Sequence, residues 1–495
     1  MSKSIMLLGT ASSVGKSTIA TAICRYYTNK GFKVAPFKAL NISLNSYVTE
    51  EGLEMGRAQV VQAEACNLKP KAWMNPVLLK PSANMKTQVI VNGKVKCTMD
   101  AYKYKDLNKE LKEVVKEIYN EKSKEFDLMV LEGSGSCAEI NLKDTDIANM
   151  YMAKVSNADV ILVADIDRGG VFASVVGTIM LLDEEERKRV KGIIINKFRG
   201  NIESFKPAMK QLEDIIKIPV LGVMPYSELD IEDEDSVTEK IKNKEINKEK
   251  LDIAIIKLKH MSNFTDFNAL ERFKNVNVRY VESKEEIGKP HVVIIPGSKS
   301  TIEDLRTLKK NGMYEKIKEL EKMNIDIIGI CGGYQMLGRL IEDRFGVEGE
   351  ITEEEGFDFL NTNTFFKEEK ETKQVKAKII SDKIKELNNI DVYGYEIHNG
   401  VTLCNDEIEK FMQTENQEVL GSINKKGNVF GTYIHGIFDY EVFTNTLLNY
   451  LSRKNKIFYV NEMKNYEEYK LNELDKLEKI FSDNISIDKI LKIKN

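Results

Sequence analysis

Short runs rich in isoleucine and valine alternate along this chain with longer segments of helical periodicity, and this alternation restricts the possible folds most strongly. It is typical of α/β domains built around parallel sheets. Several runs are apolar at consecutive positions, as expected for strands covered on both faces. In the first half we expect strands at 5–9, 33–38, 128–133, 159–166, 192–197 and 219–223.

The second half repeats the pattern after a charged stretch. At 495 residues the chain is too long for one ordinary core. Residues 232–250 carry too little apolar surface to pack, which predicts a linker. Beyond it we expect strands at 251–258, 276–281, 291–296, 325–330, 395–398 and 431–435. The sequence therefore predicts two doubly wound α/β domains, 1–231 and 251–443, followed by a helical extension, 444–495.

Composition excludes several kinds of protein. A net charge of −4, with basic residues spread along the chain, gives no electrostatic footprint for nucleic acid. No apolar run is long enough to span a bilayer, and Met1 leads directly into a strand-like segment with no secretory signal. Six scattered cysteines without a CxxC pair fit a reducing cytosol. We expect a cytoplasmic protein without nucleic-acid or membrane partners; the pattern does not reveal its oligomeric state.

A glycine-rich loop follows the first expected strand and precedes an amphipathic helix. In that position backbone N–H groups and the helix N-terminus can bind phosphates. Lys16 would neutralise phosphate oxygens, and the Ser17 hydroxyl would hold Mg²⁺. The spacing departs by one residue from the strict P-loop, and a plain βα turn is the alternative; the flanking strand and helix favour phosphate binding. The loop, which resembles that of the carboxyl-phosphorylating dethiobiotin synthetases, contributes Gly9, Thr10, Gly15, Lys16, Ser17 and Thr18.

Polar residues close several strands of the first domain. Glu132 would face the ligand crevice and hold Mg²⁺ together with Ser17. Lys38 is a candidate second phosphate ligand, and Asn196 a candidate reader of the adenine edge. The remaining candidates for substrate binding or activation are Asp146, Asp165, Asp167 and Arg168. The alternative for these residues is that they are solvated loop charges or helix caps.

Cys331 lies between an apolar strand and a helical segment, with glycines two residues before it and one and two residues after it. Such small neighbours permit the tight turn of a nucleophile elbow, and a helix N-terminus favours thiolate. The alternative is a buried, inert thiol. The turn predicts that Cys331 is a nucleophile.

A nucleophile requires a base and an oxyanion site. His435 is the best base, because it closes an expected strand and precedes a glycine, whereas His398 fits substrate contact or packing better. His291 and His260 give no catalytic signal. Backbone N–H groups at Gly332 and in the loop beginning at Gly297 would stabilise the oxyanion.

From Met1 to about Tyr440 the chain resembles the cobyric acid synthases, glutamine amidotransferases of the cobalamin pathway. The resemblance rests on long stretches at 34–38, 56–59, 74–81, 146–150, 165–173, 195–200, 331–338, 394–398 and 431–436. It implies a dethiobiotin-synthetase-like P-loop domain followed by a class I glutamine amidotransferase domain. The 394–398 stretch also occurs in cobyrinic acid a,c-diamide synthase, so the first-half stretches favour cobyric acid synthase.

The resemblance also implies a reaction. ATP and Mg²⁺ would activate the b, d, e and g carboxylates of the corrinoid adenosylcobyrinic acid a,c-diamide. Glutamine would supply nitrogen at Cys331, with His435 as base. A partitioning-type ATPase would share the phosphate loop but needs no cysteine elbow, and amidation of another large acid would fit the two sites equally well.

One departure from the family pattern concerns the acid that orients the imidazole. Class I amidotransferases carry it two residues after the histidine, where this chain has Ile437. A Cys–His dyad is therefore expected, with Asp439 or Glu396 as possible substitutes. A dyad further predicts slow glutamine hydrolysis when ATP and the corrinoid are absent.

Overall fold

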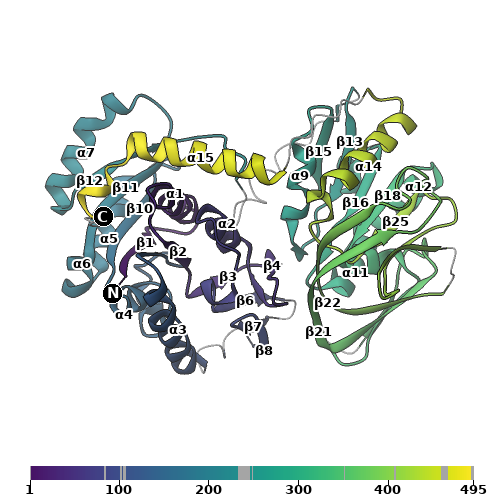
Figure 1. Cartoon of the computed structure of the whole chain (residues 1–495), viewed down its shortest axis with the longest axis horizontal. Helices are drawn as coiled ribbons and strands as arrows, with labels where there is room; N and C mark the ends of the chain where they lie inside the picture. Colours follow the sequence, from purple (N-terminus) through teal and green to yellow (C-terminus); the bar gives the residue numbers. More distant parts are fainter. Residues whose placement is uncertain are drawn as a thin grey trace.

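The computed structural model describes residues 2–82, 85–100, 103, 107–231, 246–247, 249–349, 352–405, 409–458 and 466–491. Two lobes lie side by side, and each follows one half of the chain (Figure 1). Most of the expected linker, 232–245 and 248, lies outside the described residues. None of the helices in the described parts is long and apolar enough to cross a membrane.

The N-terminal lobe is built on a parallel sheet. Its strands lie in the order β12 (Val220–Pro225), β11 (Val190–Phe198), β10 (Asp159–Asp165), β1 (Lys3–Gly9), β9 (Leu128–Glu132) and β2 (Val34–Phe37). Their side chains are buried almost throughout, because helices cover both faces. The expected strands are all present, with ends shifted by at most a few residues.

Helices divide between the two faces of this sheet. One face packs against α1 (Lys16–Asn29) and part of α2 (Arg57–Ala65). The other is covered mainly by α3 (Asn108–Lys122), α4 (Met150–Val155), α5 (Val171–Leu181) and α7 (Ile202–Ile216), with α6 (Glu184–Arg189) beside β11.

Two smaller sheets extend the lobe. One contains β3 (Leu40–Ile42), β6 (Val77–Pro81), β7 (Lys86–Val91) and β8 (Lys94–Asp100). The other pairs β4 (Ser46–Val48) with β5 (Glu54–Gly56). β4 lies on the side that faces the C-terminal lobe, and it contacts the long strands β21 (Thr362–Ile379) and β22 (Asp391–Cys404) (Figure 1).

The C-terminal lobe has a mixed sheet with a parallel half. The parallel strands are β15 (Val276–Val281), β13 (Leu251–Ile256), β16 (Val292–Ile295), β18 (Asp326–Ile330) and β25 (Val429–Thr432). The sheet continues through β24 (Val419–Ile423), β23 (Lys410–Thr414), β21, β19 (Leu340–Asp343) and β20 (Thr352–Glu355), with β22 paired to β21. Short strands β14 (Met261–Ser262) and β17 (Gly297–Ser298) pair separately. The helices are α9 (Asn268–Glu271), α10 (Lys284–Ile287), α11 (Thr301–Lys310), α12 (Met313–Lys322) and α13 (Gly332–Leu337).

The last two long helices pack against different lobes. From the sequence alone they were expected to form one helical extension after residue 443. Helix α14 (Glu441–Lys454) packs into the C-terminal core, so that boundary falls inside a helix. Helix α15 (Tyr466–Asn484) returns to the N-terminal lobe (Figure 1). Its Leu474, Leu477 and Phe481 are buried in the same cluster as α1. The sequence predicted a helical segment here but could not indicate which lobe the helix packs against.

Candidate active sites

The phosphate loop occupies the turn from β1 to α1. Gly15 has φ +91°, and a Cβ there would approach the Asn196 side-chain nitrogen to 2.0 Å, so this position requires glycine. The Lys16 ammonium donates to the carbonyls of Gly135 (2.9 Å) and Ala11 (3.4 Å) and therefore lies over the loop. A Cβ on Gly9 would lie 3.0 Å from that ammonium. The loop backbone thus surrounds a cation at the N-terminus of α1, an arrangement suited to phosphate.

The other predicted loop residues lie around it. Thr10 donates its N–H to the Val163 carbonyl (3.1 Å), and Thr18 lies in the first turn of α1. Asn196 donates its side-chain amide to the Val14 carbonyl (2.9 Å), which ties β11 to the loop. These contacts place Asn196 beside the loop, and its reading of adenine stays a prediction.

Glu132 is the centre of a buried cluster at the end of β9. Its carboxylate accepts from Ser17 Oγ (2.8 Å), Lys38 Nζ (2.9 Å) and Gln62 Nε2 (2.6 Å). Burial alone would raise the pKa of Glu132, but the charges of Lys38 and Lys16 lower it below its usual 4.5. The structure brings the two predicted Mg²⁺ ligands, Ser17 and Glu132, into contact. Lys38 pairs with Glu132 here, and phosphate binding by Lys38 stays a prediction.

The four remaining candidates of this domain lie in two places. Asp146 accepts backbone N–H groups from Ala148, Asn149 and Tyr151 at 2.8–3.0 Å, so it caps the start of α4. The other three lie at the end of β10 and on the loop after it: Asp165, the last residue of β10, pairs with Lys197 (3.2 Å), Asp167 pairs with Arg199 (2.8 Å), and Arg168 is exposed. These contacts are local, and substrate roles for all four stay predictions.

Cys331 adopts the strained backbone of a nucleophile elbow. It has φ +50° and ψ −106°, between the end of β18 and the start of α13. A Cβ on Gly333 would lie 1.9 Å from the Ile295 carbonyl, so the adjacent strand leaves space only for glycine. A non-glycine residue held at positive φ is uncommon and marks functional positions. The backbone geometry is that expected for a nucleophile in a strand-to-helix turn at a helix N-terminus, although the Cys331 side chain is buried here.

His435 has a carboxylate partner, which corrects the expected dyad. Its Nδ1 lies 2.7 Å from Asp266 Oδ2, and Asp266 Oδ1 accepts the Gly436 N–H at 3.0 Å. The side chains of His435 and Asp266 are both buried. The acid comes from the 3₁₀ turn Phe264–Phe267, far from His435 in sequence, so spacing after the histidine could not reveal it.

Neither proposed substitute orients this imidazole. Glu396 bonds His398 Nε2 (2.9 Å) and pairs with Lys373 (3.2 Å). Asp439 lies 3.8 Å from Arg57 across the lobe boundary. Asp266 occupies the position of the acid in a Cys–His–acid triad. The prediction of slow glutamine hydrolysis assumed that this acid is missing, so its basis is removed.

Opposing effects determine the charge of His435. Burial alone would lower its pKa, but the Asp266 carboxylate and the Cys331 sulfur raise it from 6.5 to about 10. Cys331 contributes through both charge and a hydrogen bond to the imidazole. The site therefore favours the imidazolium form of His435 beside the Asp266 carboxylate.

The oxyanion candidates also lie at this centre. A Cβ on Gly297 would meet His435 Cε1 at 3.2 Å, and one on Gly332 would meet the Ser298 backbone nitrogen at 2.8 Å. The loop at β17 therefore lies against both the nucleophile turn and the base. The backbone nitrogen of Ser298, which sequence reasoning did not single out, also lies beside Gly332.

The other histidines are engaged in local structure. His398 stacks on Tyr433, with ring centroids 3.7 Å apart, and its Nδ1 lies 2.7 Å from the Gly400 carbonyl. His260 bonds Asp304 (2.9 Å), which also accepts from Ser298, so it supports the oxyanion loop. His291 accepts the Asp252 N–H at a strand edge.

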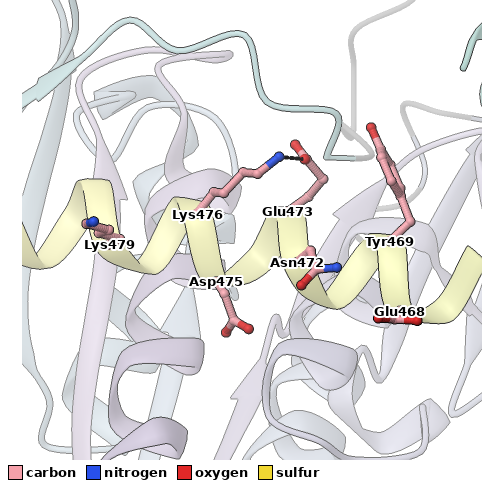
Figure 2. Close-up of a pocket in the computed structure, with 7 residues that line it drawn as sticks. All are labelled: Glu468, Tyr469, Asn472, Glu473, Asp475, Lys476 and Lys479. Atoms are coloured by element: carbon pink, nitrogen blue, oxygen red, sulfur yellow. Dashed lines mark hydrogen bonds and ion pairs between the residues drawn. The ribbon is translucent and has the colours of Figure 1, made fainter. Parts of the chain in front are cut away.

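A hollow of about 480 Å³ runs along α15, away from both predicted sites. Figure 2 shows its side chains pointing to different sides of the helix, with Lys476 paired to Glu473. Its lining residues all belong to this helix, and none was predicted to bind a ligand: Glu468, Tyr469, Asn472, Glu473, Asp475, Lys476 and Lys479.

Comparison with known proteins gives the family. Residues 5–237 match the CobQ/CobB/MinD/ParA nucleotide binding domain, and residues 252–443 match the CobB/CobQ-like glutamine amidotransferase domain. Proteins named cobyric acid synthase are similar over nearly their whole length: one from Clostridium botulinum is 58% identical (99% of each chain), and one from Clostridium perfringens is 60% identical (98% of each).

Solved structures are more distant. PurLQS from Thermotoga maritima has 16% identity and a TM-score of 0.33, covering 41% of this chain and 99% of its own. The signal recognition particle receptor FtsY from Elizabethkingia anophelis has 15% identity and a TM-score of 0.29, covering 46% and 60%. Together, the two matched domains and the near full-length relatives show that this chain belongs to the cobyric acid synthase family, the glutamine-dependent amide-forming ligases of cobalamin biosynthesis.

Proposed function

We propose that this enzyme amidates the b, d, e and g carboxylates of adenosylcobyrinic acid a,c-diamide, using ATP and glutamine, to give adenosylcobyric acid. The observation that carries the proposal is the presence, in one chain, of a Cys331–His435–Asp266 arrangement and a phosphate loop with a buried carboxylate. The names of its relatives over nearly the full chain support the corrinoid substrate.

In the glutaminase half, Cys331 attacks the side-chain amide of glutamine. The His435 imidazolium, held by Asp266, donates a proton to the departing ammonia, and the imidazole then activates water against the thioester. The N–H groups of Gly332 and of the 297–298 loop stabilise the tetrahedral oxyanion. The products are glutamate and ammonia.

In the synthetase half, a carboxylate must be activated, because its leaving group would otherwise be oxide. Transfer of a phosphoryl group from ATP gives an acyl phosphate. Ammonia attacks its carbonyl carbon and displaces phosphate, which leaves the amide. Lys16 stabilises negative charge on the transferred group. The Ser17 hydroxyl and the Glu132 carboxylate, 2.8 Å apart, are oxygen donors of the kind that Mg²⁺ prefers. When bound there, Mg²⁺ would offset phosphate charge.

We place the reaction in the cytoplasm, because all six cysteines are free in the part of the chain that the structure describes. The test is mass spectrometry of adenosylcobyrinic acid a,c-diamide incubated with enzyme, ATP, Mg²⁺ and glutamine. We expect a loss of about 1 Da for each carboxyl converted, to a total of about 4 Da, since NH₂ replaces OH four times. An unchanged corrinoid, with glutamine still hydrolysed, would mean that another acid is the acceptor.

A further inference from the structure

The base of the glutaminase lies where the two lobes meet. Tyr395 donates its hydroxyl to the Ser46 carbonyl (3.0 Å) and accepts from Asn263 Nδ2 (3.1 Å). The Ser46 N–H donates to Asn263 Oδ1 (3.3 Å), which completes a closed ring of hydrogen bonds. Ser46 belongs to the N-terminal lobe, whereas Asn263 and Tyr395 belong to the C-terminal lobe. All three residues are buried, so water does not replace these bonds in the docked state.

The two residues of this hydrogen-bonded ring that belong to the C-terminal lobe, Asn263 and Tyr395, both contact the triad directly. Asn263 begins the 3₁₀ turn that carries Asp266, and its carbonyl accepts the Asp266 N–H (3.0 Å). The Tyr395 ring stacks on the His435 ring at 5.5 Å and 22°. The backbones of Tyr395 and His435 also exchange two hydrogen bonds of 2.9 and 3.1 Å. The ring therefore fixes both partners of the Asp266–His435 pair.

A second bond joins the same turn to the N-terminal lobe. Thr265, next to Asp266, donates its hydroxyl to Asn45 Oδ1 at 3.0 Å, with both residues buried. The Asn45 carbonyl accepts the Arg57 N–H (3.2 Å), which anchors this segment to the start of α2. The segment is therefore tied to a helix of its own lobe, so that it can hold the turn in one position.

The chemistry of Tyr395 suits this role. Burial and the charge of Asp266 raise its pKa well above 10, so the hydroxyl stays protonated and donates to Ser46. If the lobes separated, the polar atoms of Asn263, Thr265 and Tyr395 would lose their partners in the other lobe. The turn carrying Asp266 would then rest on contacts within its own lobe alone.

We propose that segment 44–48 of the N-terminal lobe, through Asn263, Thr265 and Tyr395, positions Asp266 and His435 for glutamine hydrolysis. The synthetase lobe is thus a working part of the glutaminase, and full hydrolysis requires the two lobes to be docked. This inference rests on the proposed catalytic roles of Cys331 and His435.

The test uses full-length variants that each remove one contact. Tyr395→Phe keeps the ring against His435 and removes only the hydroxyl; Thr265→Val and Asn45→Ala break the second link from either side. Loss of a buried hydrogen bond predicts a fall in kcat for glutamine hydrolysis of about tenfold. We expect KM for glutamine to stay within about threefold and ammonium-dependent synthesis to be unchanged, because the perturbation is in orientation. A positioning role requires this split between kcat and KM.

The matched control is Tyr314→Phe, which removes a hydroxyl bonded to a backbone carbonyl, that of Gly356 (2.8 Å), within the C-terminal lobe. It should hydrolyse glutamine at the wild-type rate. Because Asn45 and Thr265 share one bond, their double variant should be no slower than the slower single variant. The proposal is overturned if Tyr395→Phe and Asn45→Ala both keep kcat within twofold of wild type. It is also overturned if ammonium-dependent synthesis falls in parallel with hydrolysis.

Failure of the proposed function gives a different result. Cys331→Ala, assayed in the same series, abolishes hydrolysis if the catalytic assignment is right. Hydrolysis that persists in Cys331→Ala refutes that assignment, whatever Tyr395→Phe does.

Discussion

Asp266→Asn changes the charge beside His435 with almost no change in shape. The asparagine carbonyl can still accept the Gly436 N–H, which Asp266 Oδ1 accepts at 3.0 Å. The asparagine NH₂ would then face His435 Nδ1, 2.7 Å from the present carboxylate oxygen. A donor in that position makes Nδ1 an acceptor and puts the proton on Nε2. The imidazole would hold the tautomer that cannot take a proton from Cys331.

The size of the effect follows from the charge of His435. Its pKa rises from 6.5 to about 10, which corresponds to about 5 kcal/mol favouring the imidazolium. Asp266 and Cys331 are the groups that raise it. If Asp266 supplies about half, its loss costs about 2–3 kcal/mol, or roughly 30- to 150-fold in kcat, before the tautomer is considered. We expect a fall of about 10² to 10³-fold.

The assay is glutamate release from saturating glutamine, beside synthesis from ammonium chloride as a measure of the intact synthetase. Asp326→Asn is the control: it neutralises another buried aspartate of the same lobe, paired with Lys454 at 2.8 Å. It should keep wild-type hydrolysis. Asp266→Asn with hydrolysis within threefold of wild type would refute the triad, and His435 would then act without an acid.

The remaining predictions concern each site and the stability of the fold. Cys331→Ala should abolish glutamine-dependent synthesis and keep ammonium-dependent synthesis; loss of both in a folded variant would contradict separate sites. Lys16→Ala should lower synthesis from either nitrogen source by about 10³-fold, and near wild-type turnover with ammonium would remove Lys16 from phosphate transfer. The raised pKa of His435 contributes its full stabilisation of the fold below about pH 6.5, and this contribution disappears as the pH rises through about 10. In denaturant titrations, the difference in unfolding free energy between wild type and Asp266→Asn should therefore narrow over that pH range. A difference that stays constant would contradict the charge interaction. Leu477→Ala should cost about 2–5 kcal/mol by leaving a cavity between α15 and α1; an unchanged unfolding midpoint would show that this contact does not contribute.

The elements that could be predicted from the sequence are those with a local signal, such as a run of apolar residues or a pair of glycines. Runs of isoleucine and valine located the parallel strands, because both faces of those strands are buried. The elbow at Cys331 was visible, because its turn requires glycines next to the nucleophile. Asp266 was not visible: it comes from a turn 169 positions before His435, and its only signal is three-dimensional proximity. The long strand β21 was also missed, because charged residues interrupt its apolar pattern, and of β22 only residues 395–398 were expected.

The return of α15 has a consequence for synthesis on the ribosome. Leu474, Leu477 and Phe481 fill the same cluster as Ile19 and Ile23 of α1, so the N-terminal lobe is completed by residues that are translated after the whole C-terminal lobe. Until α15 has been translated, the nascent N-terminal lobe exposes the apolar surface that this helix covers. A premature stop codon shortly before α15 would therefore destabilise the N-terminal lobe, although that lobe is encoded far from the stop. The predicted nucleotide site would be disrupted before the site at Cys331.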